Sequence, residues 1–223
     1  MFDISDGQLS DSLSNEIIIS VSAGQEHILL LTEKGQVLSF GHGSRGQLGH
    51  GNLIDIVGQN ALVIEALDGI KCKSIAAGGW HSLALSETGD VYVWGWNESS
   101  QLGFSRERET LKAIPTLLEI SDDDAFTTIS AGSRHSMAIS ENGILFGWGW
   151  NKWGQLGLDP KIVFCDSPQV IPVDEKVISK GYEYFFNFNE NYNFIRFPIY
   201  AANFGLVSLK LNMKMECNLG IKS

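Results

Sequence analysis

Cysteine, proline and basic residues are all scarce in this chain. Of its 223 residues three are cysteines, and Cys72, Cys165 and Cys217 form neither a Cys-X-X-Cys pair nor an even-numbered framework. We therefore expect a reducing compartment rather than a disulfide scaffold. Lys and Arg number 16 against 26 Asp and Glu, for a net charge of −10, and no basic cluster occurs. Because binding to a phosphate backbone needs clustered Lys and Arg, we expect no direct binding to nucleic acid.

Long apolar segments and catalytic motifs are also lacking. The sequence holds no stretch of 18 apolar residues and no signal-peptide core, so we expect no membrane association. It holds no Gly-rich phosphate loop, no Gly-X-Ser-X-Gly and no His/Cys cluster at metal-ligand spacing. These absences predict a protein that is not an enzyme and that uses no cofactor and no metal ion.

What the sequence does contain is an internal repeat of 54 residues. The motif Ala-Gly-X-X-His begins at positions 23, 77 and 131, and a Gln-Leu-Gly turn follows at 47–49, 101–103 and 155–157. Nine of the 27 columns from 23 to 49 are identical in all three copies without a gap. A fixed period of this kind predicts stacked or radially arranged units that bury surface against their neighbours.

Within each copy the pattern is that of short β-strands. In the second copy the apolar runs 82–85 and 91–94 are joined by a turn centred on Thr88-Gly89, which is a hairpin signal. A third apolar run precedes each Ala-Gly, and a weaker fourth lies at 61–64, 114–120 and 170–173. Four short strands per unit of this length are typical of a β-propeller blade.

The residues that carry the period resemble the repeat of the regulator of chromosome condensation family. The matching segments are the Ala-Gly-X-X-His-Ser strand start, the Gly-Asp-Val-Tyr-Val-Trp-Gly hairpin at 89–95 and the Asn-X-X-X-Gln-Leu-Gly turn at 97–103. Members of this family form seven-bladed propellers. The resemblance, which covers roughly 17–173, therefore implies an all-β fold, a β-propeller of this type, with about three to four blades present in this chain.

We divide the chain into an N-terminal segment at 1–16, propeller repeats at 17–176 (copies near 23–76, 77–130 and 131–176) and a divergent tail at 177–223. The next Ala-Gly-X-X-His, expected near 185, is absent, and residues 182–204 contain ten Phe or Tyr and five Asn. This break favours a tail foreign to the propeller, such as read-through beyond a splice site. A diverged closing blade is the alternative.

The recurring glycines and histidines are interpreted as structural. Equivalent positions in adjacent blades of a seven-bladed ring are rotated by about 51°, which places such histidines about 9 Å apart. That separation is too large for two nitrogens on one zinc ion. We expect each imidazole to satisfy buried backbone groups and to hold one blade to the next. These structural residues are Gly24, His27, Gly78, His81, Gly132 and His135.

The tryptophans fall into two groups. Trp94 and Trp148 replace Phe40 and are expected in the core between blades. Trp96 and Trp150, two positions further on, replace His42. Because that column accepts a polar residue, we expect it near the rim of the propeller, where tryptophan commonly anchors a protein interface. Loops that vary between copies on a rigid scaffold are also expected to carry binding. The candidate protein-binding residues are Trp80, Trp96, Arg134 and Trp150.

The resemblance also implies a function. The segments at 77–82, 86–90 and 94–99 are most similar to a small, single-propeller branch of the family. That similarity implies a non-catalytic, chromatin-associated adaptor for a Jumonji-class histone demethylase, or for histones, in chromosome segregation. The expected location is the nucleus, with the cytoplasm also open.

Two other functions stay open. The founding family member is a guanine-nucleotide exchange factor for a small GTPase, an activity that rests on a protruding β-hairpin wedge and acidic loop residues. The 54-residue period leaves no room for such an insertion in the visible blades. The last alternative is a truncated isoform without a function of its own.

Overall fold

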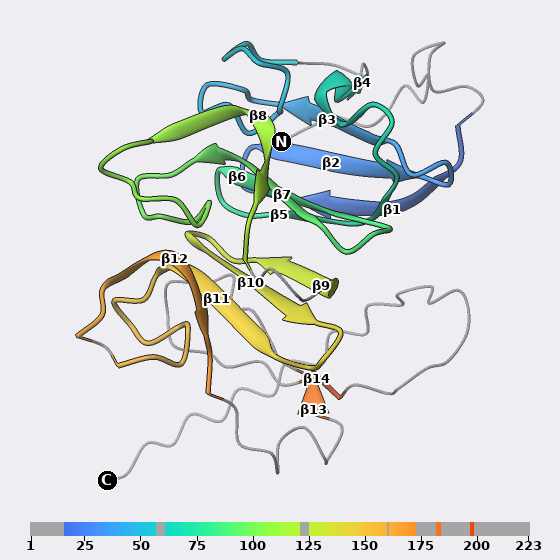
Figure 1. Ribbon diagram of the computed structural model, residues 1–223. Coiled ribbons are helices and arrows are strands. Elements are labelled where there is room, and N and C mark those ends of the chain that lie inside the picture. Colours follow the sequence, from blue (N-terminus) through green and yellow to red (C-terminus); the bar gives the residue numbers. More distant parts are fainter. Residues whose placement is uncertain are drawn as a thin grey trace, which may run out of the picture.

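Three four-stranded antiparallel sheets make up the ordered body of the molecule (Figure 1). The computed structural model describes residues 16–56, 61–120, 125–159 and 161–172, and the backbone of 182–183 and 197–198. Within those residues the helical content is one 3-10 turn, η1 (Glu65–Leu67), and no helix is long and apolar enough to cross a membrane. The predicted all-β fold is thereby confirmed.

Each sheet follows the chain in order, first strand to fourth. The first strands begin at 18, 72 and 126, so the 54-residue period of the sequence is also the period of the structure. The strands of the first sheet are β1 (Ile18–Ala23), β2 (His27–Thr32), β3 (Val37–Gly41) and β4 (Leu62–Val63); of the second β5 (Cys72–Ala77), β6 (His81–Ser86), β7 (Val91–Trp96) and β8 (Leu111–Leu118); and of the third β9 (Phe126–Ala131), β10 (His135–Ser140), β11 (Leu145–Trp150) and β12 (Phe164–Val170).

The central hairpin of each sheet turns at a glycine, as the sequence predicts. Gly35, Gly89 and Gly143 have φ angles of 82°, 93° and 78°. Side chains with a Cβ rarely adopt this left-handed conformation, whereas glycine does so without steric cost. The hairpin prediction is confirmed in all three sheets.

The fourth strand of the third sheet was predicted at 170–173, and this placement is wrong. β12 begins at Phe164, opposite Trp150, and ends at Val170, opposite Phe146. The strand starts early because its first residues pair with the C-terminal end of β11, and the register of this pairing shifts between Gly147 and Gly149. Beyond Val170 the backbone N–H of Ile171 still donates to the carbonyl oxygen of Leu145 at 2.8 Å, so the predicted run overlaps only the last part of this pairing.

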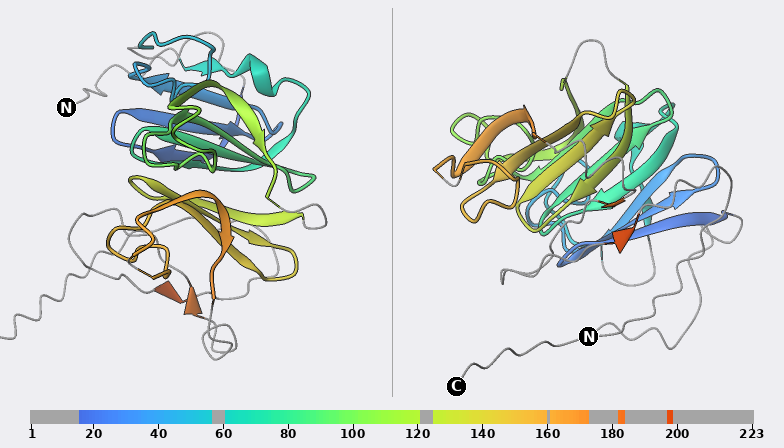
Figure 2. Two further views of the ribbon diagram at one scale, coloured as in Figure 1. Left: turned by 60° about the vertical axis from the view of Figure 1, so that its left-hand side comes forward. Right: turned by 90° about the horizontal axis from the view of Figure 1, so that it is seen from below.

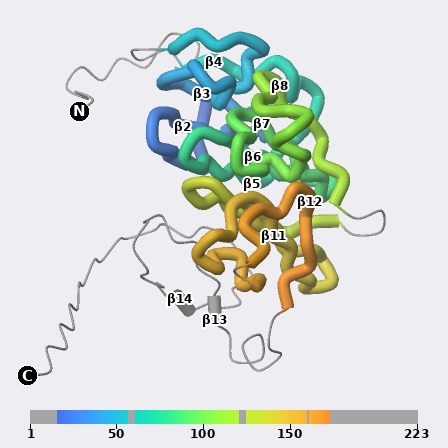
Figure 3. The backbone as a smooth tube through the Cα atoms, turned by 90° about the vertical axis from the view of Figure 1, so that its left-hand side faces the viewer, coloured from blue at the N-terminus to red at the C-terminus, as the bar shows by residue number. Residues whose placement is uncertain are grey.

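The sheets lie side by side as blades of a fan, and the backbone visits them one after another (Figures 2 and 3). The first strand of each sheet contacts the first strand of the next, β1 with β5 and β5 with β9. This arrangement confirms the propeller-type architecture inferred from the repeat.

The apolar core lies between the sheets rather than within one of them. Trp94 packs with Leu29 and Leu31 between the first and second sheets, and Trp148 packs with Leu83 and Leu85 between the second and third. Both indoles are fully buried, which confirms the prediction that they belong to the inter-blade core. Burying an aromatic side chain of this size stabilises the fold by about 2–3 kcal/mol, so these two contacts are major links between blades.

A polar contact also joins the second sheet to the third. Ser100 has a φ of 59° at a position where the other copies have Gly46 and Gly154. Its hydroxyl donates a hydrogen bond to a carboxylate oxygen of Asp166 in β12. The backbone strain at Ser100 is therefore accompanied by a bond that a glycine could not make.

The expectations for the two ends of the chain fall largely outside the described residues. This holds for 1–15 and for 173–223 apart from two short strands, β13 (Tyr182–Glu183) and β14 (Phe197–Pro198), which pair antiparallel. Whether the tail is foreign to the propeller stays a prediction.

Candidate functional site: the blade junction and the rim

The repeated histidines lie at the junction between sheets. Nε2 of His27 is 2.8 Å from the hydroxyl of Ser82 in the next sheet, and Nε2 of His81 is 2.9 Å from the hydroxyl of Ser136 in the one after. The sequence predicts backbone partners for these imidazoles. The structure adds a serine hydroxyl at Nε2, beside a backbone hydrogen bond of His81 to His27 and of His135 to His81. The serine is in turn bonded to the backbone, since the hydroxyl of Ser82 donates to the carbonyl oxygen of Gln47 at 2.9 Å.

The same carbonyl fixes the protonation of the histidine. Gln47 accepts hydrogen bonds from the Ser82 hydroxyl and from the indole N–H of Trp94, both at 2.9 Å. Since the only proton of Ser82 is donated there, its oxygen must accept from His27, so the neutral form of this imidazole carries its proton on Nε2. Gln101 repeats this arrangement with Ser136 and Trp148, at 2.7 and 2.9 Å.

Burial favours the same neutral form. It lowers the pKa of His27 from 6.5 to about 4, that of His81 to about 3 and that of His135 to about 4. All three imidazoles are uncharged near neutral pH, so they act as hydrogen-bonding groups of the framework rather than as a positive surface. Within the described residues, no group of three or more His, Cys, Asp and Glu side chains lies close enough to hold a metal ion.

The glycine of the Ala-Gly-X-X-His motif is explained by the position of the ring. A Cβ atom on Gly78 would lie 2.5 Å from Nδ1 of His81 and 2.7 Å from the carbonyl oxygen of Gly132 in the next sheet. Gly24 and Gly132 are crowded by His27 and His135 in the same way. The backbone at this glycine must lie directly against the imidazole, and any side chain would prevent that approach.

The predicted protein-binding residues gather at one end of the sheets. At this rim, the turn between the first and second strands of a sheet meets the end of its third strand. The backbone N–H of Trp96 donates to the carbonyl oxygen of Trp80 at 2.8 Å, and the N–H of Trp150 donates to the carbonyl oxygen of Arg134 at 2.9 Å. Trp80 and Trp96 pack edge to face, with ring centroids 5.4 Å apart at 89°. All four candidate residues are half-buried.

Two arginines connect these tryptophans into one continuous feature. The guanidinium carbon of Arg45 lies 4.3 Å from the ring centroid of Trp80 and 4.7 Å from that of Trp96. The guanidinium carbon of Arg134 lies 5.3 Å from Trp96 and 5.7 Å from the ring of Trp150. We call this feature the Trp–Arg strip, and it consists of Trp80, Arg45, Trp96, Arg134 and Trp150.

The strip crosses all three sheets, and Trp96 lies at its middle. Arg45 comes from the loop after β3, and Arg134 from the turn before β10, so each sheet contributes at least one member. At the Trp80 end, the indole N–H donates to a carboxylate oxygen of Glu26 at 3.0 Å. The strip therefore brings together the four predicted residues and adds Arg45, which sequence reasoning missed.

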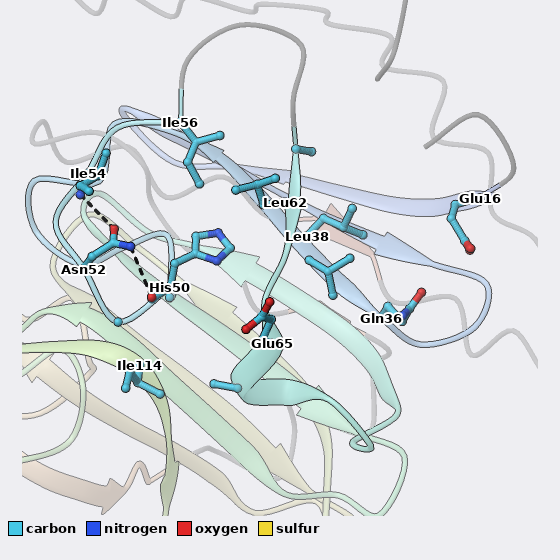
Figure 4. A pocket seen from close by; sticks show the side chains of 15 residues that line it. Glu16, Gln36, Leu38, His50, Asn52, Ile54, Ile56, Leu62, Glu65 and Ile114 are labelled. Carbon is cyan, nitrogen blue, oxygen red and sulfur yellow. Dashed lines mark hydrogen bonds between the residues drawn. The ribbon is translucent and has the colours of Figure 1, made fainter. Parts of the chain in front are cut away.

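A cavity of about 830 Å³ at the outer edge of the first sheet is the main alternative site (Figure 4). It is lined by the loop around His50 and Asn52, by β3 and β4, by Glu65 and by Ile114 of β8. Nε2 of His50 is 2.9 Å from the hydroxyl of Ser39, a pairing that superficially resembles a catalytic one.

The geometry of Ser39 argues against catalysis. Its hydroxyl is fully buried and donates to the carbonyl oxygen of Leu48 at 2.7 Å, so His50 cannot receive the serine proton. Burial lowers the pKa of His50, and the nearby Glu65 opposes that shift. These contacts fix the loop around Leu48 to β3 and form no activated nucleophile.

The repeats match a known protein family. Residues 34–85, 88–139 and 142–180 match the regulator of chromosome condensation (RCC1) repeat, and a second description of that repeat matches 18–47, 72–101 and 126–155. The chain belongs to the RCC1 repeat family. The resemblance seen in the sequence is therefore confirmed.

Relatives within the RCC1 family differ widely in length and role. The chain is 40% identical to mouse RCC1 domain-containing protein 1, over 60% of this chain and 44% of the mouse protein. It is 36% identical to the ultraviolet-B receptor UVR8 of Arabidopsis thaliana, over 71% of this chain and 35% of the receptor. The chain thus spans less than half the length of these relatives.

A solved structure supports the same fold. Prp20p of Saccharomyces cerevisiae superposes with a TM-score of 0.63 at 26% identity, over 74% of this chain and 40% of Prp20p. That structure was reported together with the binding properties of Prp20p to Gsp1p and histones. The three described sheets correspond to part of such a propeller.

Proposed function

We propose that this RCC1-family chain is a non-catalytic protein-interaction scaffold of the nucleus and an adaptor for a histone-modifying enzyme of the Jumonji demethylase class. The observation that carries the proposal is the Trp–Arg strip, in which turns and strand ends of three consecutive sheets present aromatic and cationic side chains at one end of a rigid framework. Tryptophan and arginine are among the residues most enriched at the energetic centres of protein interfaces. Chromatin as the setting is supported by Prp20p, which binds histones.

The proposal predicts direct binding to a purified Jumonji-class histone demethylase. We expect a saturable complex with the full-length chain, because the strip is pre-formed and needs little ordering on binding. Surface-immobilised demethylase with the chain in solution measures this directly, and an unrelated non-haem iron oxygenase on a second surface is the control. Equal retention on both surfaces, or on neither, would contradict the adaptor role.

Nucleotide exchange is the second candidate, since Prp20p is a relative that binds Gsp1p. In the described residues, the chain after β3, β7 and β11 is taken up by the Gln-Leu-Gly turns and contains no additional hairpin. We therefore expect no acceleration of GDP release from a Gsp1p-type GTPase. Release of a fluorescent GDP analogue at increasing concentrations of the chain, with Prp20p as the positive control, tests this. A dose-dependent, saturable acceleration would make the protein an exchange factor.

A further inference from the structure

The two arginines of the Trp–Arg strip have no acidic partner within the part of the chain that the structure describes. Each guanidinium contacts indole rings, and neither forms a hydrogen bond or an ion pair with a described residue. Two other described cations do form ion pairs. Lys34 is 2.6 Å from Glu16, and Lys112 is 2.6 Å from Glu109.

Carboxylates that could pair with these arginines are available. Acidic residues outnumber basic ones by 26 to 16, so carboxylates are plentiful on the surface. One of them, Glu26, lies beside the strip but accepts from the indole N–H of Trp80 instead of pairing with Arg45. The N–H groups of both guanidiniums thus stay available at a place where the surrounding protein could have neutralised them.

Stacking on indoles prepares a guanidinium for a carboxylate. The ring face holds the planar cation in one orientation, which lowers the conformational entropy that binding must remove, and leaves its in-plane N–H donors at the edge. A carboxylate accepts two of those donors in parallel, in a geometry that lysine cannot reproduce. The occupied indole faces also exclude a cationic ligand such as a methylated lysine, because arginine already fills the place where its charge would bind.

The spacing suits an extended peptide. Arg45 and Arg134 lie 4.7 and 5.3 Å from the centroid of the same ring, Trp96, so the two cations are within about 10 Å of each other. Alternate residues of an extended chain are about 6.6 Å apart and point to the same side. Two acidic side chains at positions i and i+2 can therefore reach both arginines while the peptide crosses Trp96.

From these observations we infer that the Trp–Arg strip is a docking site for an acidic, extended segment of a partner protein, in which carboxylates at alternate positions pair with Arg45 and Arg134 across Trp96. This inference rests on the proposed scaffold function and specifies the chemistry of its partner. A nucleic acid is disfavoured as the occupant, because two arginines in a chain of net charge −10 offer too few phosphate contacts.

Fluorescence anisotropy with labelled ten-residue peptides tests the inference. The probes are an alternating Glu-Ser peptide, its Gln-Ser counterpart, a Lys-Ser peptide and a ten-nucleotide single-stranded DNA, each titrated with the full chain at 50 mM salt. We expect the Glu-Ser peptide to bind at least tenfold more tightly than the other three. A Glu-Ser affinity no better than that of the Gln-Ser peptide overturns the inference, and tighter binding of the DNA assigns the strip to phosphates instead.

Variants locate the binding on the strip. Arg45→Gln and Arg134→Gln are each expected to weaken Glu-Ser binding at least fivefold, and Arg45→Lys at least threefold, because lysine keeps the charge but loses the planar fork. Arg106→Gln is the matched control. Arg106 also stacks on an aromatic ring, with its guanidinium carbon 3.6 Å from the ring centroid of Phe164, but it lies outside the strip. An equal loss in Arg106→Gln would show that binding follows overall charge, and would overturn the inference.

Two further readouts separate this inference from the proposed function. Excitation of the tryptophans at 295 nm should show a change in emission on Glu-Ser binding that is absent in Arg134→Gln. This signal also reports whether each variant is folded, because the buried Trp94 and Trp148 keep their emission. Demethylase binding that survives in Arg45→Gln and Arg134→Gln would overturn the acidic docking site and leave the scaffold function standing. Binding of the Glu-Ser peptide without binding of the demethylase would overturn the adaptor function and leave the docking site standing.

Discussion

Replacing Gly78 by alanine is expected to lower the free energy of unfolding by more than about 4 kcal/mol. The added Cβ would lie 2.5 Å from Nδ1 of His81 and 2.7 Å from the carbonyl oxygen of Gly132. Neither neighbour can move freely, because His81 is hydrogen-bonded to Ser136 and the carbonyl belongs to the backbone of the next sheet. Relief of the clash requires separation of the second and third sheets, which also exposes Trp148. Urea unfolding followed by tryptophan emission measures the loss.

Gly69→Ala is the matched control for this substitution. Gly69 has a φ of 78°, but no atom lies within 4 Å of the position of its Cβ. Alanine there should cost about 1 kcal/mol, the cost of the left-handed conformation alone. Gly78 does not have a positive φ, so the two variants separate crowding from backbone conformation. If both variants lose the same stability, the close approach of the imidazole is not the reason for glycine in the repeated motif.

The repeat predicted the framework well because framework residues have the same environment in every blade. Trp94 and Trp148 were placed in the core from one observation, that they replace Phe40, and both are fully buried. The hairpin glycines were identified for the same reason, since each turn needs the same positive φ. An identical column in a repeat reports an identical physical requirement, and such a requirement can be recognised from residue type and spacing.

Contacts between blades were harder to predict. The histidine of one copy pairs with the serine 55 residues later, as in His27 with Ser82, and the first copy has Ile28 in the serine column. The pairing is visible in the sequence only once it is known which faces of successive sheets meet. For the same reason Arg45 was missed. Its column holds Arg, Ser and Trp in the three copies, and its role depends on Trp80 and Trp96 of the neighbouring sheet.

Acid is expected to destabilise the protein well before its carboxylates are protonated. His27, His81 and His135 have pKa values of about 4, 3 and 4 in the folded protein, each lowered by burial from 6.5. Below pH 6.5 the unfolded chain therefore binds protons that the folded chain does not, and the free energy of unfolding falls as the pH falls. The stability that the neutral histidines provide is fully present above pH 6.5, and its loss is complete only below the folded pKa values.

The size of the effect follows from the shifts. At pH 5, a histidine whose pKa is about 3 in the folded protein and 6.5 in the unfolded chain lowers the free energy of unfolding by about 2 kcal/mol. Three such groups can remove most of the stability of a domain whose total is about 5–15 kcal/mol. Urea unfolding at pH 7 and pH 5 measures the difference. Carboxylates that ionise near pH 4 contribute little in this interval.

His81→Ala separates the titration from the structural role of the imidazole. At pH 7 the variant should be less stable by about 1–3 kcal/mol, because the hydroxyl of Ser136 loses the imidazole N–H that donates to it. Its further loss between pH 7 and pH 5 should be smaller than that of the parent by about 2 kcal/mol, since one titrating group is gone. A parent and variant with the same pH dependence would show that His81 does not titrate in this range. Zinc measured in both purified proteins should be equally low, and stoichiometric zinc lost with His81 would replace the hydrogen-bonding role by a metal site.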